Sequence, residues 1–432
     1  MKSFPFSNSH FFTQNRRNFI RQLLPGSVAI FLSNDEQPRS SDQVYPFRQN
    51  PDFFYLTGID QEKSILLLFP DCPNPALREV LFVQETNEHI ALWEGAKYSK
   101  KQAAEVSGIG RVEWIDVFQA SVREAMVYAA NVYIGTIENN RHNGESDYRS
   151  LRFAHDLMHR YPMHRYHRAT PIITGLRLIK SSEEIEVIRT AVDITANAFR
   201  RVLRFVKPGI TEYEIEAEII HEYIRSKATG HSFQPIIASG GDACILHYVS
   251  NNKICSDGDL LLLDTGAEYG NYAGDLSRTF PVNGRFSIRQ RQVYESCLRV
   301  LKKAIALMLP GTCIDAFHKE VMMIMAFELK VLGLIDTLPA APDAETFDAV
   351  RKYFPHGTSH FLGLDVHDEG HRFEPFRPGM ILTCEPGIYI KEEGIGVRLE
   401  NNILITENGP IDLTHDVPIE VDEIEAIMNQ RA

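Results

Sequence analysis

The feature that most constrains the fold of this chain is a succession of signals that occurs twice after residue 180. In each copy, a Ser or Thr followed three positions later by Glu, Gln or Asp marks a helix start, a Pro-Gly pair ends that helix, and a second such box opens another. The boxes are Ser181–Glu184 and Thr211–Glu214 in the first copy, and Ser287–Gln290 and Thr312–Asp315 in the second. A strand-like stretch with the pattern Gly-x5-acid-x-Gly then reaches Asp264 in one copy and Glu385 in the other. We expect an internal duplication whose halves face each other across a pseudo-twofold axis, with these two acids together at the centre.

The residues before this duplication follow a different sequence pattern, which indicates a separate domain. Short runs rich in Val, Ile, Leu and Phe alternate with helix-like stretches, a pattern typical of α/β structure. The strand-like runs are 28–32, 64–69, 79–83 and 131–135, and the helix-like stretches are 99–106 and 117–130. The segment 168–177, ahead of the first capping box, is the expected linker. We therefore predict an α/β domain over residues 1–172 and an α+β domain over residues 173–432.

Composition argues against several classes of function. The net charge of -12 and the isoelectric point near 5.8 disfavour a nucleic-acid partner, because phosphates require a basic surface. The longest apolar runs, such as 65–69 and 260–263, are too short to cross a membrane, and the first residues lack the apolar region of a signal peptide. Six scattered cysteines without a Cys-x-x-Cys pair are typical of reduced thiols. We expect a cytoplasmic protein with neither a membrane nor a nucleic acid as partner.

Five side chains that commonly bind metals follow in order along the duplicated part: Asp264, Asp275, His360, Glu385 and Glu400. Four carboxylates and one imidazole form a hard, oxygen-rich set, which suits a pair of divalent ions better than one structural zinc. The alternative for any single acid is a solvated surface charge. Asp264 argues against that alternative, because a lone carboxylate directly after four leucines would carry a large desolvation cost.

The segments that carry these residues are 264–275 (DTGAEYGNYAGD), 356–368 (HGTSHFLGLDVHD), 378–387 (PGMILTCEPG) and 396–401 (GVRLEN). Their order and flanks resemble the pita-bread metallopeptidases, a family that includes methionine aminopeptidase, prolidase and Xaa-Pro aminopeptidase. The resemblance implies a pita-bread catalytic domain with two divalent ions, which Asp275 and Glu400 would bridge. It places Asp264 on one ion, and His360 with Glu385 on the other. Manganese is the expected metal, and cobalt and zinc also suit such donors.

Three further histidines, His247, His356 and His367, match positions that the resembling enzymes use around the substrate. The resemblance implies that they hydrogen-bond the scissile carbonyl or the tetrahedral diolate and shuttle a proton. A structural role is the alternative for each histidine taken alone. Arg398 and Glu400 alternate along an expected strand, so both should point to the same face, where the arginine would orient the bridging carboxylate.

Other segments separate the members of the family. The stretches 47–58 (FRQNPDFFYLTG) and 92–95 (LWEG) resemble the N-terminal domain of Xaa-Pro aminopeptidases and prolidases. Ser359, beside the ligand histidine, and the tail 416–425 (DVPIEVDEIE) are closer to the Xaa-Pro aminopeptidases. We therefore predict a dinuclear-metal aminopeptidase that hydrolyses the N-terminal Xaa-Pro bond of peptides through a metal-bridging water or hydroxide. The resemblance also implies a homo-oligomer, a dimer or a tetramer.

Alternative functions stay open at this point. A prolidase, limited to Xaa-Pro dipeptides, is the nearest one. A metal-free peptide-binding paralogue and a creatinase-like hydrolase would both lack the metal ligands that this chain keeps. The short interval between Asp368 and Gly379 leaves less chain to close the pocket beyond proline, which favours substrates longer than dipeptides. His371 and Arg372 lie in this interval, either at the border of the specificity pocket or as a solvated basic pair.

Overall fold

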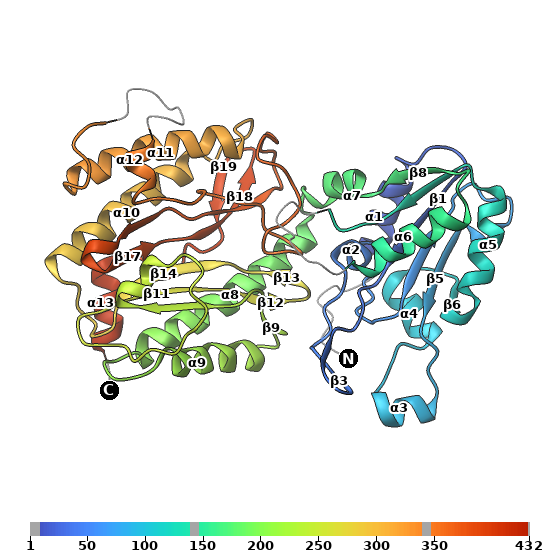
Figure 1. Ribbon diagram of the computed structural model, residues 1–432, viewed down its shortest axis with the longest axis horizontal. Coiled ribbons are helices and arrows are strands. Elements are labelled where there is room, and N and C mark those ends of the chain that lie inside the picture. The colour runs from blue at the N-terminus through green and yellow to red at the C-terminus, as the bar shows by residue number, and fades with distance from the viewer. Residues whose placement is uncertain (1–8, 139–146, 339–346, 431–432) are drawn as a thin grey trace. The chain divides into compact units, whose positions relative to one another are not determined.

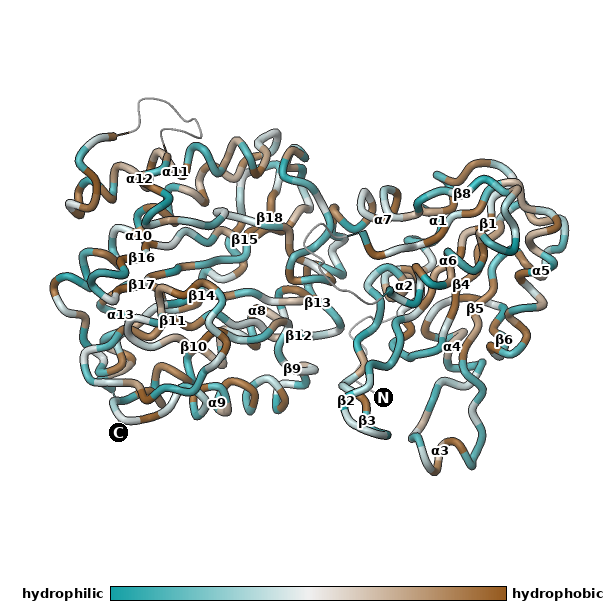
Figure 2. The backbone as a smooth tube through the Cα atoms, viewed as in Figure 1, coloured by the Kyte–Doolittle hydropathy of each residue, from teal (hydrophilic) through white to brown (hydrophobic). Residues whose placement is uncertain are grey.

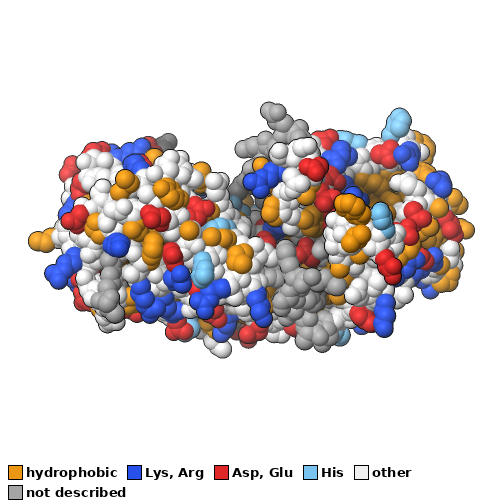
Figure 3. All heavy atoms as spheres, turned by 90° about the horizontal axis from the view of Figure 1, so that it is seen from below, with side chains coloured by type: hydrophobic (Ala, Val, Ile, Leu, Met, Phe, Trp, Pro, Cys, Tyr) orange, Lys and Arg blue, Asp and Glu red, His pale blue; other side chains and the backbone are white. Residues whose placement is uncertain are grey.

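The computed structural model describes residues 9–138, 147–338 and 347–430. The chain divides into two compact units, Met1–Arg177 and Leu178–Ala432, which Figure 1 colours from blue to green and from green to red. Within the described residues, no helix combines the length and the apolar character needed to cross a bilayer. Figure 3 shows acidic and basic side chains interspersed over the face that it draws, without a broad region of one sign.

The first unit is built on a mixed six-stranded sheet in the order β6-β5-β4-β1-β7-β8. The strands are β1 (Ser27–Leu32), β4 (Ile65–Leu68), β5 (Glu79–Val83), β6 (Val112–Trp114), β7 (Asn131–Ile134) and β8 (Arg165–Arg168). The central strand β1 is antiparallel to β4 and parallel to β7. A separate two-stranded ribbon joins β2 (Pro38–Ser40) and β3 (Gln43–Val44). Figure 2 shows β4 and β5 largely in the colours of hydrophobic residues, as expected of strands covered on both faces.

Helices cover both faces of this sheet. They are α1 (His10–Ile20), α2 (Pro51–Thr57), α4 (Lys100–Ser107), α5 (Phe118–Tyr128), α6 (Arg149–Arg160) and α7 (Thr170–Arg177), with the 3-10 turns Pro75–Leu77 and Ile115–Val117. Helix α3 (Glu88–Glu94) buries no residue and extends away from the sheet (Figure 1). Val28 and Ile30 belong to one hydrophobic cluster with residues of α5 and α6. Phe31 points the other way, to Phe19 of α1, in an edge-to-face contact with the ring centroids 5.1 Å apart. Alternate residues of β1 thus serve opposite layers, which is the α/β arrangement predicted for this part of the chain.

The expected linker at 168–177 is wrong. Arg168 ends strand β8, and the following residues form helix α7, which is the last element of the first unit. Ile173 of this helix is fully buried. The proline of this helix stands in the first turn, where its missing N–H costs no hydrogen bond.

The second unit contains two long helix pairs. Its helices are α8 (Ser182–Phe205), α9 (Glu212–Arg225), α10 (Ile288–Leu307), α11 (Ile314–Val331), α12 (Asp348–Arg351) and α13 (Val421–Asn429). The capping boxes at Ser181, Thr211 and Ser287 all form. The fourth does not: α11 begins after Cys313 without a side-chain cap. The carboxylate of Asp315 instead pairs with Lys319 and Arg372.

Small antiparallel sheets lie between the two helix pairs (Figure 1). Their orders are β10-β11-β14, β13-β12-β9, β15-β18-β19 and β16-β17. The strands are β9 (Gly230–His231), β10 (Ile236–Ser239), β11 (Leu260–Thr265), β12 (Ala267–Tyr269), β13 (Tyr272–Ala273), β14 (Leu276–Pro281), β15 (Ile381–Cys384), β16 (Gly387–Ile390), β17 (Ile395–Arg398), β18 (Asn401–Thr406) and β19 (Gly409–Asp412), and the 3-10 turns are Gly240–Cys244 and Lys391–Glu393. A single hydrophobic cluster joins these strands to both helix pairs. The order helix, helix, strands thus occurs twice, as the duplication predicted.

Candidate metal centre

All nine residues that the sequence singled out for the site line one cavity of about 350 Å³ in the second unit. They are Asp264, Asp275, His360, Glu385, Glu400, His247, His356, His367 and Arg398. Apolar side chains, among them Phe233, Ile236 and Leu246, form another part of the wall. His371 and Arg372 do not belong to this lining: both are exposed and pair with Glu374 and Asp315.

The two halves of the duplication supply their acids in the same way. Asp264 lies near the end of β11, and Glu385 directly follows β15. Asp275 directly precedes β14, and Glu400 directly precedes β18. Since β11 pairs with β14 and β15 with β18, each half brings the end of one strand beside the start of the next. Four carboxylates therefore converge although they lie far apart in sequence.

His360 stands among these acids with one nitrogen prepared for a cation. Its Nδ1 lies 3.0 Å from the carbonyl oxygen of Phe361, which can only accept, so Nδ1 carries the proton and Nε2 keeps its lone pair. Nε2 lies 3.5 Å from Oδ2 of Asp275 and 3.6 Å from Oε1 of Glu385. One donor atom each of Asp275, His360 and Glu400 lie within 4.8 Å of one another. Such a group of atoms can surround a divalent ion.

Asp264 contributes an oxygen that lacks a protein partner. Its Oδ2 accepts a hydrogen bond from Nη2 of Arg398 at 2.6 Å. Its Oδ1 is buried and has no hydrogen-bond partner among the described residues. A buried carboxylate oxygen in that state carries a desolvation cost that a cation would offset. The donor set and this oxygen both fit divalent metal ions.

The raised pKa values of the acids also indicate a site for divalent ions. Burial raises the pKa of Asp275 to about 6 and that of Glu385 to about 7, and it raises the pKa of Glu400 well above its usual range. The negative charges of the neighbouring acids add to the effect of burial. Burial alone would lower the pKa of His360, but Asp275 and Glu385 raise it. Positive ions among these groups would favour the ionised carboxylates and the neutral imidazole.

Arg398 connects the acids through a network that sequence analysis missed in part. Its Nε donates to Oγ of Ser277 at 2.9 Å and its Nη1 to the hydroxyl of Tyr389 at 3.0 Å. Ser277 in turn donates to Oε2 of Glu400 at 2.7 Å. Arg398 and Glu400 were expected to alternate along one strand, but β17 ends at Arg398. The two side chains are therefore connected through Ser277. Ser277 could have been found from its spacing of two after Asp275, whereas Tyr389 carries no such signal.

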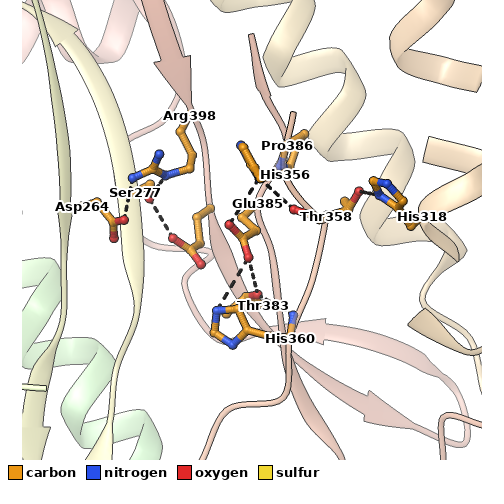
Figure 4. A network of polar contacts seen from close by, with 12 residues as sticks. Asp264, Ser277, His318, His356, Thr358, His360, Thr383, Glu385, Pro386 and Arg398 are labelled. Atoms are coloured by element: carbon orange, nitrogen blue, oxygen red, sulfur yellow. Dashed lines mark hydrogen bonds and ion pairs between the residues drawn. The ribbon is translucent and has the colours of Figure 1, made fainter. Parts of the chain in front are cut away.

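Thr383 is a second residue that the sequence did not reveal. Its hydroxyl accepts a hydrogen bond from the backbone N–H of His360 at 3.1 Å and donates to Oε1 of Glu385 at 3.4 Å. Figure 4 shows it between these two side chains. Thr383 can thus orient His360 and Glu385 toward the same ion.

The three histidines proposed for the substrate differ in their surroundings. Nδ1 of His356 lies 2.8 Å from the carbonyl oxygen of Gly357, and its Nε2 lies 2.8 Å from the hydroxyl of Tyr389. Burial lowers the pKa of His356 to about 3, so its ring is neutral at physiological pH. His247 and His367 are exposed at the cavity wall. The ring of His367 stands edge-on to that of His360, with centroids 4.5 Å apart.

Two family models match this chain. Metallopeptidase family M24 matches residues 186–407, and the N-terminal domain of aminopeptidase P matches residues 12–133. This chain belongs to metallopeptidase family M24. It is 36% identical to the Xaa-Pro aminopeptidase of Escherichia coli, over 96% of this chain and 97% of that one. It is 32% identical to human Xaa-Pro aminopeptidase 3, over 93% of this chain and 81% of that one.

Solved structures agree with the sequence comparison. The structure of E. coli aminopeptidase P with the inhibitor Pro-Leu matches at a TM-score of 0.87 and 35% identity, over 98% of each chain. The zinc-substituted E. coli enzyme in complex with product matches at a TM-score of 0.86 and 34% identity, again over 98% of each chain. These matches confirm the pita-bread fold with its α/β N-terminal domain. They also confirm that the M24 member described here is a metal-dependent aminopeptidase.

Proposed function

We propose that this enzyme removes the N-terminal residue from peptides in which proline is second. The observation that carries the proposal is the similarity to Xaa-Pro aminopeptidases, which extends over nearly the whole of both chains and includes both domains. A prolidase would share the catalytic ligands, so the ligands by themselves do not separate the two functions.

We propose two divalent ions in the site, with manganese as the preferred metal and cobalt or zinc as possible substitutes. Asp275 and Glu400 would bridge the ions, Asp264 would bind one, and His360 with Glu385 the other. The short distances between donor atoms of Asp275, His360 and Glu400 support this assignment, as does the unpartnered oxygen of Asp264. Bound ions of this kind supply Lewis acidity and an activated water at neutral pH.

The other residues of the cavity would orient ligands and substrate. Arg398 would hold Asp264 directly and Glu400 through Ser277, so that the carboxylates keep their orientation. His247 and His367 would donate hydrogen bonds to the carbonyl oxygen as negative charge develops on it. His356 already has a partner at both ring nitrogens, so a direct contact with substrate would require it to leave Gly357 or Tyr389.

Peptide length separates the proposed function from a prolidase. A prolidase must recognise the free carboxylate of proline, whereas an aminopeptidase must let the chain continue past it. The short interval between Asp368 and Gly379 favours the open arrangement. We therefore propose that tripeptides and longer peptides are the substrates.

The test compares kcat/KM for one Xaa-Pro dipeptide and for its one-residue extension Xaa-Pro-Yaa, with added manganese. Faster cleavage of the tripeptide supports the aminopeptidase. Hydrolysis confined to the dipeptide would identify a prolidase and leave the metal chemistry unchanged. An N-acetylated tripeptide serves as the control, because a free amine should be needed beside the acids.

We also propose that the enzyme works in the cytoplasm as a homo-oligomer, a dimer or a tetramer. All six cysteines are free, and five of them are buried, which suits a reducing compartment. Sedimentation of the purified enzyme tests the oligomer directly, because a single species at the monomer mass would contradict it.

A further inference from the structure

We propose that two buried polar networks hold the substrate-side histidines in place, Glu212 acting on His247 through Tyr248 and Lys180 acting on His367 through Asp368. This inference rests on the proposed function for the role of the histidines. The four residues are positioning residues, because none of them lines the cavity. In both cases the anchored residue directly follows the histidine in sequence.

The first network is centred on Glu212, the first residue of α9, which is completely buried. Its Oε1 accepts hydrogen bonds from the backbone N–H and the hydroxyl of Ser239, at 2.8 and 2.7 Å. Its Oε2 accepts one from the hydroxyl of Tyr248 at 2.8 Å and one from the N–H of Lys253 at 3.0 Å. All four bonds go to one carboxylate, which thereby ties α9 and β10 to the segment that carries His247.

The second network is an ion pair between Lys180 and Asp368. Nζ lies 2.9 Å from Oδ2, and each side chain is only 1% exposed. The N–H of Asp368 also donates to the carbonyl oxygen of Phe361 at 2.9 Å. Gly363 fits against this pair with little space to spare, since a Cβ at that position would lie 2.3 Å from Oδ2 of Asp368. The pair thus fastens the segment that carries His367 to Lys180, which directly precedes Ser181, the N-cap of α8.

Local structure alone does not fix either histidine. His247 lies in a turn after a 3-10 helix, and His367 lies in a loop outside the strands. The ring of His247 makes no hydrogen bond to any described residue. Each histidine is exposed at the cavity, whereas the next residue is buried and points to its network. Loops gain such order from contacts made by their backbone and neighbouring side chains, so these anchors set where the imidazoles stand.

The first test removes one hydrogen bond from each network without leaving an unpaired charge. Tyr248→Phe deletes the hydroxyl that contacts Glu212. The double variant Lys180→Met with Asp368→Asn replaces the pair together, because loss of one partner alone would leave a buried charge and could unfold the protein. We expect each variant to lower kcat by about 10- to 100-fold with KM little changed, since a misplaced imidazole weakens transition-state contacts. Metal content should stay near that of the wild type.

The matched control is Tyr166→Phe. Tyr166 donates its hydroxyl to the carbonyl oxygens of Leu157 and Tyr161 in the first unit, at 3.0 and 2.9 Å. The variant Tyr166→Phe loses a hydroxyl group, as Tyr248→Phe does, but in the first unit and not in the catalytic one. We expect the kcat of this control to stay within twofold of the wild-type value, which corresponds to about 0.4 kcal/mol in activation free energy at 25 °C.

The decisive test combines each anchor variant with each histidine variant. In the His247→Ala background, Tyr248→Phe should cause almost no further loss of kcat, but in the His367→Ala background it should cause its full loss. The double variant at Lys180 and Asp368 should show the reverse pattern. A loss of equal size in both backgrounds would mean a general structural role and overturn the proposal.

A second readout does not depend on the substrate. Amide hydrogen exchange of the metal-loaded enzyme should rise in segment 245–249 for Tyr248→Phe and in segment 364–368 for the double variant, and in neither segment for Tyr166→Phe. Unchanged exchange in these segments overturns the anchors, whatever peptide the enzyme cleaves. Failure of the wild type to cleave Xaa-Pro-Yaa would instead overturn the proposed function, and the exchange result would still decide on the anchors.

Discussion

Nη2 of Arg398 lies 2.6 Å from Oδ2 of Asp264, and this contact joins the two halves of the duplication. Arg398 belongs to the second half and Asp264 to the first. The same guanidinium also reaches Ser277 and Tyr389, so three of its nitrogens are engaged. A lysine has a single compact ammonium and cannot repeat this planar set of contacts.

The first prediction therefore concerns Arg398→Lys. It keeps the positive charge but loses the fork that orients Asp264 and, through Ser277, Glu400. We expect metal affinity or kcat/KM to fall by about 10- to 100-fold, the usual effect of losing a group that orients metal ligands. Isothermal titration with manganese and steady-state kinetics measure the two quantities. Wild-type values in both would show that the ligands keep their orientation without this side chain.

The second prediction concerns the bridging acids. Asp275→Asn and Glu400→Gln should abolish activity, because a neutral amide is a poor bridge between two cations. The metal-free variants should be at least as stable as the metal-free wild type, since burial opposes the ionised carboxylates that they replace. Thermal unfolding and elemental analysis provide the measurements. An enzyme that stays fully active after chelation has removed every divalent ion would contradict the mechanism.

The third prediction concerns pH. Burial raises the pKa of Asp275 to about 6 and that of Glu385 to about 7, above their values in the unfolded chain. The folded metal-free protein thus binds more protons than the unfolded chain up to about pH 7. The two acids therefore contribute to the free energy of unfolding at low pH, and this contribution is lost as the pH rises through 6 to 7. Metal binding needs the ionised acids and should become tighter over the same interval.

Two pH titrations check the predicted directions of change in stability and in metal affinity. The melting temperature of the chelated enzyme, compared with that of chelated Asp275→Asn, should decrease from pH 5.5 to pH 8, and manganese should restore it most at pH 8. Calorimetry in two buffers of different ionisation enthalpy should show proton release on metal binding near pH 6. Manganese affinity that is equal at pH 5.5 and pH 8 would mean that the acids are already ionised without metal.

The fourth prediction separates ligands from substrate contacts. His247→Ala and His367→Ala should lower kcat by about 100- to 1000-fold, as for loss of one donor to a developing oxyanion, while metal content stays near wild type. His360→Ala is the matched control and should lose metal directly. His356→Ala removes a partner of Tyr389 and should also lower turnover without stripping metal. If His367→Ala loses a metal ion, the separation between ligands and donors is wrong.

Much of the architecture could be predicted because its signals are local. The boxes at Ser181, Thr211 and Ser287 need only residues three positions apart, and all three cap helices as expected. The box at Thr312 failed because Asp315 has partners four and 57 residues away, Lys319 and Arg372, which no local pattern reveals. The linker at 168–177 was placed only by its position ahead of the first capping box, and the burial of Ile173 in helix α7 could not be seen from that position.

The candidate site divides in the same way. The four acids and the histidine predicted as metal ligands carry recognisable flanks, and all five line the cavity. The roles of Ser277, Thr383 and Tyr389 come from contacts that form only in the folded chain. Ser277 meets Glu400 across the two halves, whereas Thr383 meets His360 and Tyr389 meets His356 within the second half. Ser277 and Glu400, for example, are 123 residues apart in sequence and 2.7 Å apart in space. Hydroxyl groups that orient ligands are therefore what sequence reading misses in a site of this kind.

The proposed function requires that the metal-loaded enzyme select proline at the second position of the peptide. The most direct measurement compares kcat/KM for two tripeptides that differ only there, Xaa-Pro-Yaa and Xaa-Ala-Yaa, with manganese present. We predict cleavage of the first Xaa-Pro bond at a far higher kcat/KM than that of the Xaa-Ala bond, and loss of both activities after chelation. Equal or faster cleavage of Xaa-Ala-Yaa would contradict the claim.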